Sequence, residues 1–182
     1  IKLTVNNIVY TGTADGNGDW EIEVTNVLPE DEYTVRATAT DALDNESIEG
    51  TELLVIDLTA PDAPVIDDLI TNDQTPDITG TAEALSTLNV TVNGVTYTTE
   101  ADTSGVWRVT TTLLFDNTYT VTATATDLAG NTSTVGSGSL EIDTVAPTRP
   151  IINDLQTNDR TPGITGTAEP QSQITAFLDG LN

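Results

Sequence analysis

The chain has 182 residues, 37% hydrophobic content and a formal net charge of −24, with five Lys and Arg residues against 29 Asp and Glu. This balance argues against nucleic acid and anionic membranes as partners, because both are bound through clusters of basic residues. Without Cys or His, the chain has no disulfides or thiolate metal sites, and it lacks the commonest catalytic bases and nucleophiles. No apolar run is long enough to predict insertion into a membrane.

The first 57 residues show strand patterns and turn signals. Trp20, Ile22 and Val24 alternate with two glutamates, which predicts a strand with one buried face. The preceding Asp15–Asp19 stretch resembles the start of a calcium loop, but it lacks the closing glutamate and also fits a hairpin turn. Tyr33 and its later counterpart Tyr119 each open a strand just after a turn, where either a tyrosine corner or an ordinary core tyrosine is expected.

Asp57-Leu58-Thr59-Ala60-Pro61 closes this first part, and Asp143-Thr144-Val145-Ala146-Pro147 repeats it 86 residues later. Proline fixes the backbone and has no N–H, so each copy is expected to end one sheet and begin a stiff connector. Other segments repeat at the same offset, which indicates a tandem array of domain-sized modules. The expected parts are a partial module (1–57, without its first two strands), a complete module (58–143) and the start of a third (144–182).

Turn signals divide the complete module at intervals of about 8–12 residues. Alternating apolar and polar residues indicate half-buried strands, and Asn93-Gly94 predicts a tight hairpin. The segment 67–76 is expected to be a polar turn. We therefore predict an all-β chain of tandem immunoglobulin-like, seven-stranded β-sandwiches. The expected strands cover residues 64–66, 78–82, 88–92, 95–99, 107–111, 119–125 and 132–142.

The third part begins with the strands that the first part lacks. The tail of one chain is therefore expected to complete the head of another, which gives head-to-tail strand complementation between chains. In a longer folded chain, the neighbouring modules of the same chain would make this exchange unnecessary.

Four motifs in register carry a resemblance to a known family. They are Asp143–Pro147, the Gly-Thr-Ala-Glu at 80–83, the turn from Ala101 to Trp107, and Asp127-Leu128-Ala129-Gly130-Asn131. With them the chain resembles the bacterial Ig-like repeats of giant Gram-negative surface adhesins, including biofilm-associated proteins and type I-secreted, RTX-type adhesins. One departure is Asp44, which stands where the later copy of the turn has Gly130.

The resemblance implies a function and a location. It implies a structural extender on the bacterial cell surface, a calcium-stiffened rod that projects a distal binding domain for adhesion or biofilm formation. The residues themselves give no support for catalysis, because His and Cys are missing and the carboxylates sit on turns, so we do not expect an enzyme. Two alternatives remain: an Ig-like binding module for a glycan or another cell, and an accessory domain of a secreted polysaccharide-degrading enzyme. The outward threonine row from Thr120 to Thr126 fits a binding face, but it also fits an ordinary solvated strand face.

The strand directions indicate where a cation would bind. One end of the module is expected to hold the incoming linker, Glu83, Asp102 and the Asp127–Asn131 turn. The other end is expected to hold Asp116, Asp143 and the 67–73 carboxylates. Ca²⁺ prefers six to eight oxygen ligands in flexible geometry, which such joints supply, although Asp, Asn and Gly also occur in turns for conformational reasons. The candidate metal ligands are Asp57, Glu83, Asp127, Asn131, Asp143, Glu169, Asp67, Asp73 and Asp102, with Asp57 and Asp143 expected to control stiffness.

Overall fold

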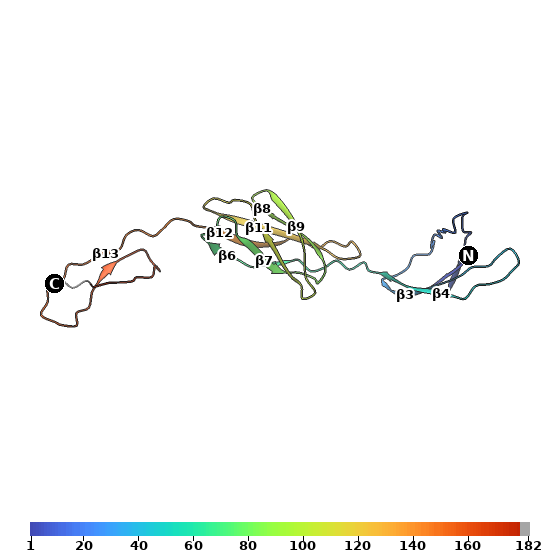
Figure 1. The fold of residues 1–182 in the computed structure, drawn as a ribbon, viewed down its shortest axis with the longest axis horizontal. Helices are drawn as coiled ribbons and strands as arrows, with labels where there is room; N and C mark the ends of the chain where they lie inside the picture. The colour runs from blue at the N-terminus through green and yellow to red at the C-terminus, as the bar shows by residue number, and fades with distance from the viewer. Residues whose placement is uncertain (179–182) are drawn as a thin grey trace.

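The computed structural model describes residues 1–178. Its three parts follow one another along an elongated molecule (Figure 1). These residues form strands, turns and irregular segments without any helix, and so none that could cross a membrane. We call residues 1–57 the head, residues 58–143 the central module and residues 144–178 the tail.

The head is a single antiparallel sheet with the strand order β2-β1-β3-β4. Leu3, Val5 and Tyr33 are buried on its inner face. Asn6 and Asn7 connect the first hairpin with φ angles of 47° and 62°, the left-handed pair that a tight two-residue turn needs. Its strands are β1 (Lys2–Val5), β2 (Ile8–Thr11), β3 (Asp31–Thr38) and β4 (Gly50–Ile56).

The strand predicted at Trp20, Ile22 and Val24 does not form, so this prediction was wrong. In the central module the matching strand β10 (Val106–Thr110) pairs with β7 (Asp77–Thr81). The described part of the head has no counterpart of β7. The sequence between Gly12 and Asp31 therefore keeps its alternating pattern but lacks a ladder of hydrogen bonds to join.

The central module is a sandwich of two sheets, with orders β10-β7-β5 and β6-β12-β11-β8-β9. Alternation along each strand turns its apolar residues toward the space between the sheets. Trp107 and Val109 come from the first sheet, and Leu88, Val121 and Leu140 come from the second. The remaining strands are β5 (Val65–Ile66), β6 (Leu69–Thr71), β8 (Thr87–Val92), β9 (Val95–Glu100), β11 (Asn117–Thr126) and β12 (Gly136–Ile142).

The first strand of the central module is split between the two sheets. β5 pairs antiparallel with β7, and after Asp67 and Asp68 the chain crosses over so that β6 pairs parallel with β12. The prediction of a continuous polar turn over 67–76 was therefore wrong for Leu69–Thr71. The immunoglobulin-like sandwich is confirmed, with its first strand counted as two segments.

Both tyrosine corners are present. The Tyr119 hydroxyl donates to the Phe115 carbonyl at 2.9 Å, and the Tyr33 hydroxyl donates to the Pro29 carbonyl at 2.9 Å. Each bond joins the start of a strand to the backbone four residues earlier, which is the arrangement of a tyrosine corner. The corner prediction is therefore confirmed for both tyrosines, and Tyr33 is in addition part of the buried core of the head.

The tail carries a short antiparallel pair of strands, β13 (Ile151–Ile152) and β14 (Gly166–Thr167). Most of its apolar side chains are exposed, including Phe177. The end of the expected third part, residues 179–182, lies outside the described residues.

Candidate metal centre at the module junctions

The first junction packs its prolines onto the central module. Pro61 and Pro64 are buried, although they belong to a linker. A Cβ on Gly136 would lie 1.9 Å from the Pro64 carbonyl oxygen, so only glycine allows the connector to lie this close to β12. The junction is thus fixed to the central module by backbone packing as well as by proline stiffness.

The turn Asp127–Asn131 reaches from the central module to this linker. The carboxylate of Asp127 accepts hydrogen bonds from the Gly130 N–H at 2.7 Å, the Asn131 N–H at 2.8 Å and the Asn131 side-chain amide at 2.9 Å. The same side-chain amide donates to the Asp57 carbonyl at 3.1 Å. Residues 74 positions apart in sequence are thereby joined at the junction.

These contacts determine the ionisation of Asp127. Burial by itself raises the pKa of this carboxyl, but the hydrogen bonds from the Asn131 side chain and from the backbone outweigh it and hold the pKa below 3.8. Donors directed at a carboxylate favour its charged form. Asp127 is therefore an anion at neutral pH beside the Asp57 carbonyl.

The oxygens at the first junction have the chemistry that calcium prefers, but they do not form a closed cage. Asp57 uses one carboxylate oxygen to accept the Thr59 N–H at 3.0 Å. Asp102 accepts the backbone N–H groups of Ser104 and Val106. Across residues 1–178, no three acidic side chains lie close enough together to hold a metal ion.

The second junction repeats the first only in part. Asp143 accepts the Val145 N–H at 2.9 Å, as Asp57 does with Thr59. The Thr148 N–H donates to the Glu169 carboxylate at 3.3 Å, which brings linker and tail together. The Thr144 hydroxyl donates to both Asp116 oxygens, a contact that the sequence analysis did not identify.

The strand pairing confirms most of the predicted sorting of carboxylates between the two ends. Asp102 and Asp127 follow strands that end beside Thr87, whereas Asp143 follows a strand that ends beside Asn117. We call these the upstream and downstream ends of the central module.

Asp67 and Asp68 do not lie at an end, so their predicted position was wrong. Asp67 accepts the Thr79 hydroxyl at 2.7 Å, and Asp68 accepts the Ser139 N–H at 2.7 Å, both halfway along strands. Both residues belong to the crossover between β5 and β6, which passes along the middle of the module and not at its end. Asp73 accepts the N–H and hydroxyl of Thr75 and closes the turn after β6.

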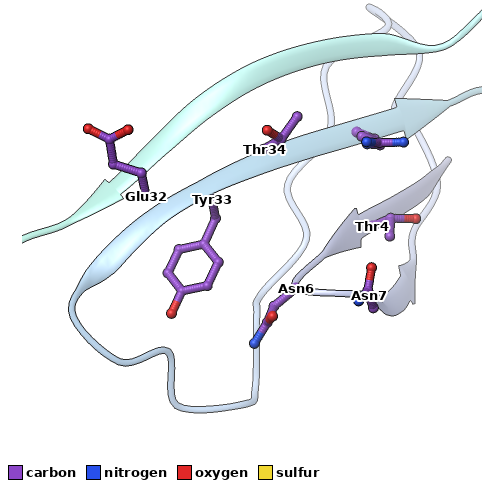
Figure 2. Close-up of a pocket in the computed structure, with 7 residues that line it drawn as sticks. Thr4, Asn6, Asn7, Glu32, Tyr33 and Thr34 are labelled. Atoms are coloured by element: carbon purple, nitrogen blue, oxygen red, sulfur yellow. The ribbon is translucent and has the colours of Figure 1, made fainter.

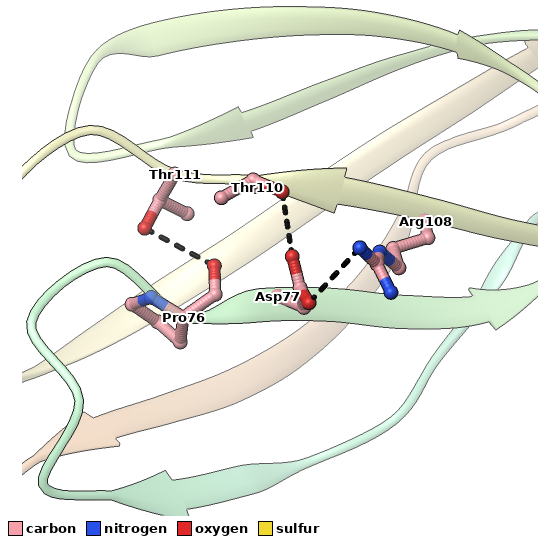
Figure 3. Close-up of polar contacts among 5 residues, drawn as sticks. All are labelled: Pro76, Asp77, Arg108, Thr110 and Thr111. Carbon is pink, nitrogen blue, oxygen red and sulfur yellow. Dashed lines mark hydrogen bonds and ion pairs between the residues drawn. The ribbon is translucent and has the colours of Figure 1, made fainter.

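One charged cluster of the central module was not expected from the sequence. Figure 3 shows Asp77 between two partners on β10: the Thr110 hydroxyl at 2.6 Å and the Arg108 guanidinium at 3.4 Å. These side chains project from neighbouring strands of the three-stranded sheet. Because the ion pair is exposed to solvent, it adds little to the stability of the strand pair.

The surfaces that would suit a small ligand are shallow or internally bonded. A polar hollow of about 300 Å³ lies over the head sheet, lined in part by Thr4, Asn6 and Thr34 (Figure 2). Arg36, which also lines it, is paired with Glu49. In the threonine row of β11, the Thr126 hydroxyl bonds to that of Thr132 at 3.0 Å, and on the neighbouring strands Thr91 bonds to Thr96 at 2.8 Å.

Comparisons with known proteins agree with this architecture. The family model described as a bacterial Ig-like domain matches residues 51–144, more than half of the chain. The chain therefore belongs to the bacterial Ig-like domain family. No curated protein sequence matches it.

Several solved structures resemble parts of the chain. One is a "Ca2+-stabilized adhesin" that "helps an Antarctic bacterium reach out and bind ice", with 25% identity and a TM-score of 0.37 over 84% of this chain and 42% of that one. A biofilm-associated protein BSP domain has 24% identity and a TM-score of 0.39 over 80% and 25%. Fibronectin(III)-like modules of Clostridium thermocellum CbhA have 12% identity and a TM-score of 0.43 over 78% and 77%. The chain thus spans less than half the length of the first two structures.

Proposed function

We propose that this chain is part of an extracellular spacer on a bacterial surface, in which tandem Ig-like modules hold a distal binding domain away from the cell. The observation that carries the proposal is the bond from Asn131 to the Asp57 carbonyl, together with the buried linker prolines. A spacer needs joints that resist bending more than it needs a pocket. Membership of the Ig-like family and the repeat of module motifs at an offset of 86 residues support the same function.

We further propose that calcium stiffens these joints. In the first joint, the Asn131 side-chain amide donates to both the Asp57 carbonyl and the Asp127 carboxylate. Glu83 is exposed two residues after the end of β7. Carboxylate and carbonyl oxygens are the ligands that Ca²⁺ takes, and a flip of the Asn131 amide would exchange its two donated hydrogen bonds for an oxygen ligand. A cation there would also relieve the repulsion that a net charge of −24 creates along the chain.

Small-angle scattering with calcium and with a chelator tests both parts of the proposal. We expect the maximum dimension to increase with calcium, and Asp57→Ala to reduce this increase while leaving the melting of the central module in chelator unchanged. Asp19→Ala is the matched control, since it removes one exposed carboxylate from a turn outside the junctions.

Two results would count against the proposal. If the molecule is equally extended with chelator, calcium has no part in stiffening. If Asp57→Ala keeps the full calcium response, the metal binds elsewhere.

A further inference from the structure

The linker at the first junction is attached to the head as well as to the central module. The Thr59 hydroxyl donates to the Glu30 carboxylate at 2.7 Å, and Glu30 directly precedes β3 of the head. Two residues before Thr59, the Asp57 carbonyl accepts a hydrogen bond from the central module. Two residues after it, Pro61 is buried. The attachments therefore alternate along the linker, from the central module to the head and back again.

This alternation restricts bending at the joint. The contact of Thr59 with the head lies two residues from each contact with the central module, so even an extended backbone leaves only about 7 Å of chain between them. A tilt of the head that exceeds this length has to break one of the contacts. Pro61 reduces the freedom further, because its ring fixes φ. The hydrogen bond from Thr59 is therefore one of the contacts that oppose bending.

The second junction has an equivalent contact made by different residues. The Thr144 hydroxyl donates to both Asp116 oxygens, at 2.8 and 3.0 Å. Asp116 and Glu30 occupy equivalent places, each directly before the strand residue that pairs with the last residue of the outgoing strand. In both junctions the linker is thus bonded to the module that it leaves.

The two linkers begin with the same backbone turn, so their side chains can be compared position by position. Asp57 accepts the N–H of Thr59 at 3.0 Å, and Asp143 accepts the N–H of Val145 at 2.9 Å. Each aspartate thus binds the residue two positions ahead, the pattern of an Asx-turn. The next two residues are Leu-Thr in the first linker and Thr-Val in the second. Each linker therefore has one threonine and one exposed apolar residue, in opposite order.

The acidic partner changes together with the position of the threonine. In the first linker the threonine is the second residue after the aspartate and its partner is Glu30, whereas in the second linker it is the first residue and its partner is Asp116. Glutamate has one methylene more than aspartate, so the longer side chain is paired with the more distant threonine. The two hydrogen bonds nevertheless have nearly the same length, 2.7 and 2.8 Å. The contact is thus kept while the residues that make it differ.

We propose that the pairs Thr59–Glu30 and Thr144–Asp116 are clasps that fix the direction in which each linker leaves its module. This inference deepens the proposed spacer function, on which it rests, and adds a source of stiffness that needs no metal. Both distances are those of good O–H···O hydrogen bonds. Chelation of calcium should therefore leave the clasps in place.

A distance measurement between head and central module tests the first clasp. Because the chain contains no Cys, Thr34→Cys on β3 and Ser137→Cys on β12 place one spin label on each part, at exposed positions. Double electron–electron resonance in chelator then gives the distribution of distances between the labels. Thr59→Val should broaden it and lower the ratio of clasped to released joints about fivefold, the factor given by the usual net strength of one hydrogen bond. Thr118→Val, at an exposed position outside this junction, is the matched control and should have no effect.

Exchanging one clasp for the other tests the matching of side-chain lengths. Glu30→Asp alone shortens the acidic side chain and should broaden the distribution as Thr59→Val does. Combining Glu30→Asp with Leu58→Thr and Thr59→Val recreates the residues of the second junction and should restore the narrow distribution. All of these side chains are exposed, and melting curves in chelator check that each variant is folded.

Two results would overturn the proposal. One is a distribution for Thr59→Val that is no broader than that for Thr118→Val. The other is a triple variant as broad as the double variant Glu30→Asp/Thr59→Val, which lacks a linker threonine. Because every measurement is made in chelator, failure of the clasps is distinguishable from failure of the calcium response of the spacer.

Discussion

At the residue scale, aspartate acts in this chain mainly as a turn former. The carboxylates of Asp15, Asp41, Asp102 and Asp127 all accept backbone N–H groups two to four residues ahead. Asp44 has a φ of 64° at the position where the later turn has Gly130 at 98°, so the turn keeps its left-handed residue despite the substitution. Hydrogen bonds within each turn thus hold its shape.

A pH titration should detect the hydrogen bonds that the carboxylates of Asp15 and Asp41 accept. The pKa of Asp41 is lowered mainly by the side chain of Asn45, and that of Asp15 mainly by the backbone N–H of Asn17. A lowered folded-state pKa means that the stabilisation is complete above the ordinary value of 3.8 and is lost as the pH falls through the lowered pKa. Carboxyl NMR titration should give midpoints below 3.8 for both; ordinary midpoints would contradict the hydrogen-bonded turns.

Asn131→Ala tests the junction bond against a matched control. Asn45 makes the same bond to its own turn aspartate but has no bond to a linker, so Asn45→Ala removes the turn contact alone. Compared with Asn45→Ala, Asn131→Ala should remove about 1 kcal/mol more of the free energy that holds the linker on the central module, the usual net value of one hydrogen bond. It should appear as greater protease sensitivity of the linker 57–64. Equal sensitivity of the two variants would mean that the bond does not hold the joint.

At the element scale, the sequence predicted those strands whose pairing partner is close in sequence or whose alternating apolar and polar pattern is long. The β8–β9 hairpin, with Asn93 and Gly94 both at positive φ, and the ten-residue β11 were predictable because local chemistry determines them. The absence of a strand at Trp20 and the presence of β6 were not predictable, because each depends on whether a distant strand is present to pair with the segment. Register with a distant partner has no local signal.

The same reasoning applies to the candidate site. Asp57, Asp127 and Asn131 were correctly expected at one joint from the strand directions. Asp67 was misplaced because the crossover between sheets was not foreseen. For the hydrogen bond from the Asn131 side chain to Asp57, the sequence gives no signal beyond the preference of Asn for turns, because the acceptor lies 74 residues away.

Gly80→Ala tests the packing of β5, β7 and β10 in the central module. The new Cβ would lie 2.0 Å from the Val65 carbonyl oxygen and 2.5 Å from the Trp107 ring, so β5 or the indole has to move. We expect a loss of about 1–3 kcal/mol in the free energy of unfolding, the usual cost of overpacking. Denaturant unfolding measures it, with Gly163→Ala as the control at an open position. A neutral Gly80→Ala would show that the indole is not held against this strand.

At the scale of the whole molecule, calcium should raise thermal stability if it binds at the joints. Extracellular modules bind it with dissociation constants of about 10⁻⁴–10⁻³ M. A single site at about a hundredfold excess over its dissociation constant would contribute about 2.7 kcal/mol. Differential scanning calorimetry with calcium and with chelator should show a higher melting temperature in calcium. Superimposable melting curves would remove calcium from the proposed function.

The split first strand has a consequence for a molecule under tension. β6 and β12 run parallel, while the chain leaves the central module through opposite ends, at Asp57 and at Asp143. A pull along the molecule therefore slides these two strands past each other and loads all their hydrogen bonds together. In a hairpin pulled from its open end, the bonds would break one after another. In the proposed spacer, tension would thus load the strand pair in the direction in which it resists best, and the crossover at Asp67 and Asp68 is the feature that creates this geometry.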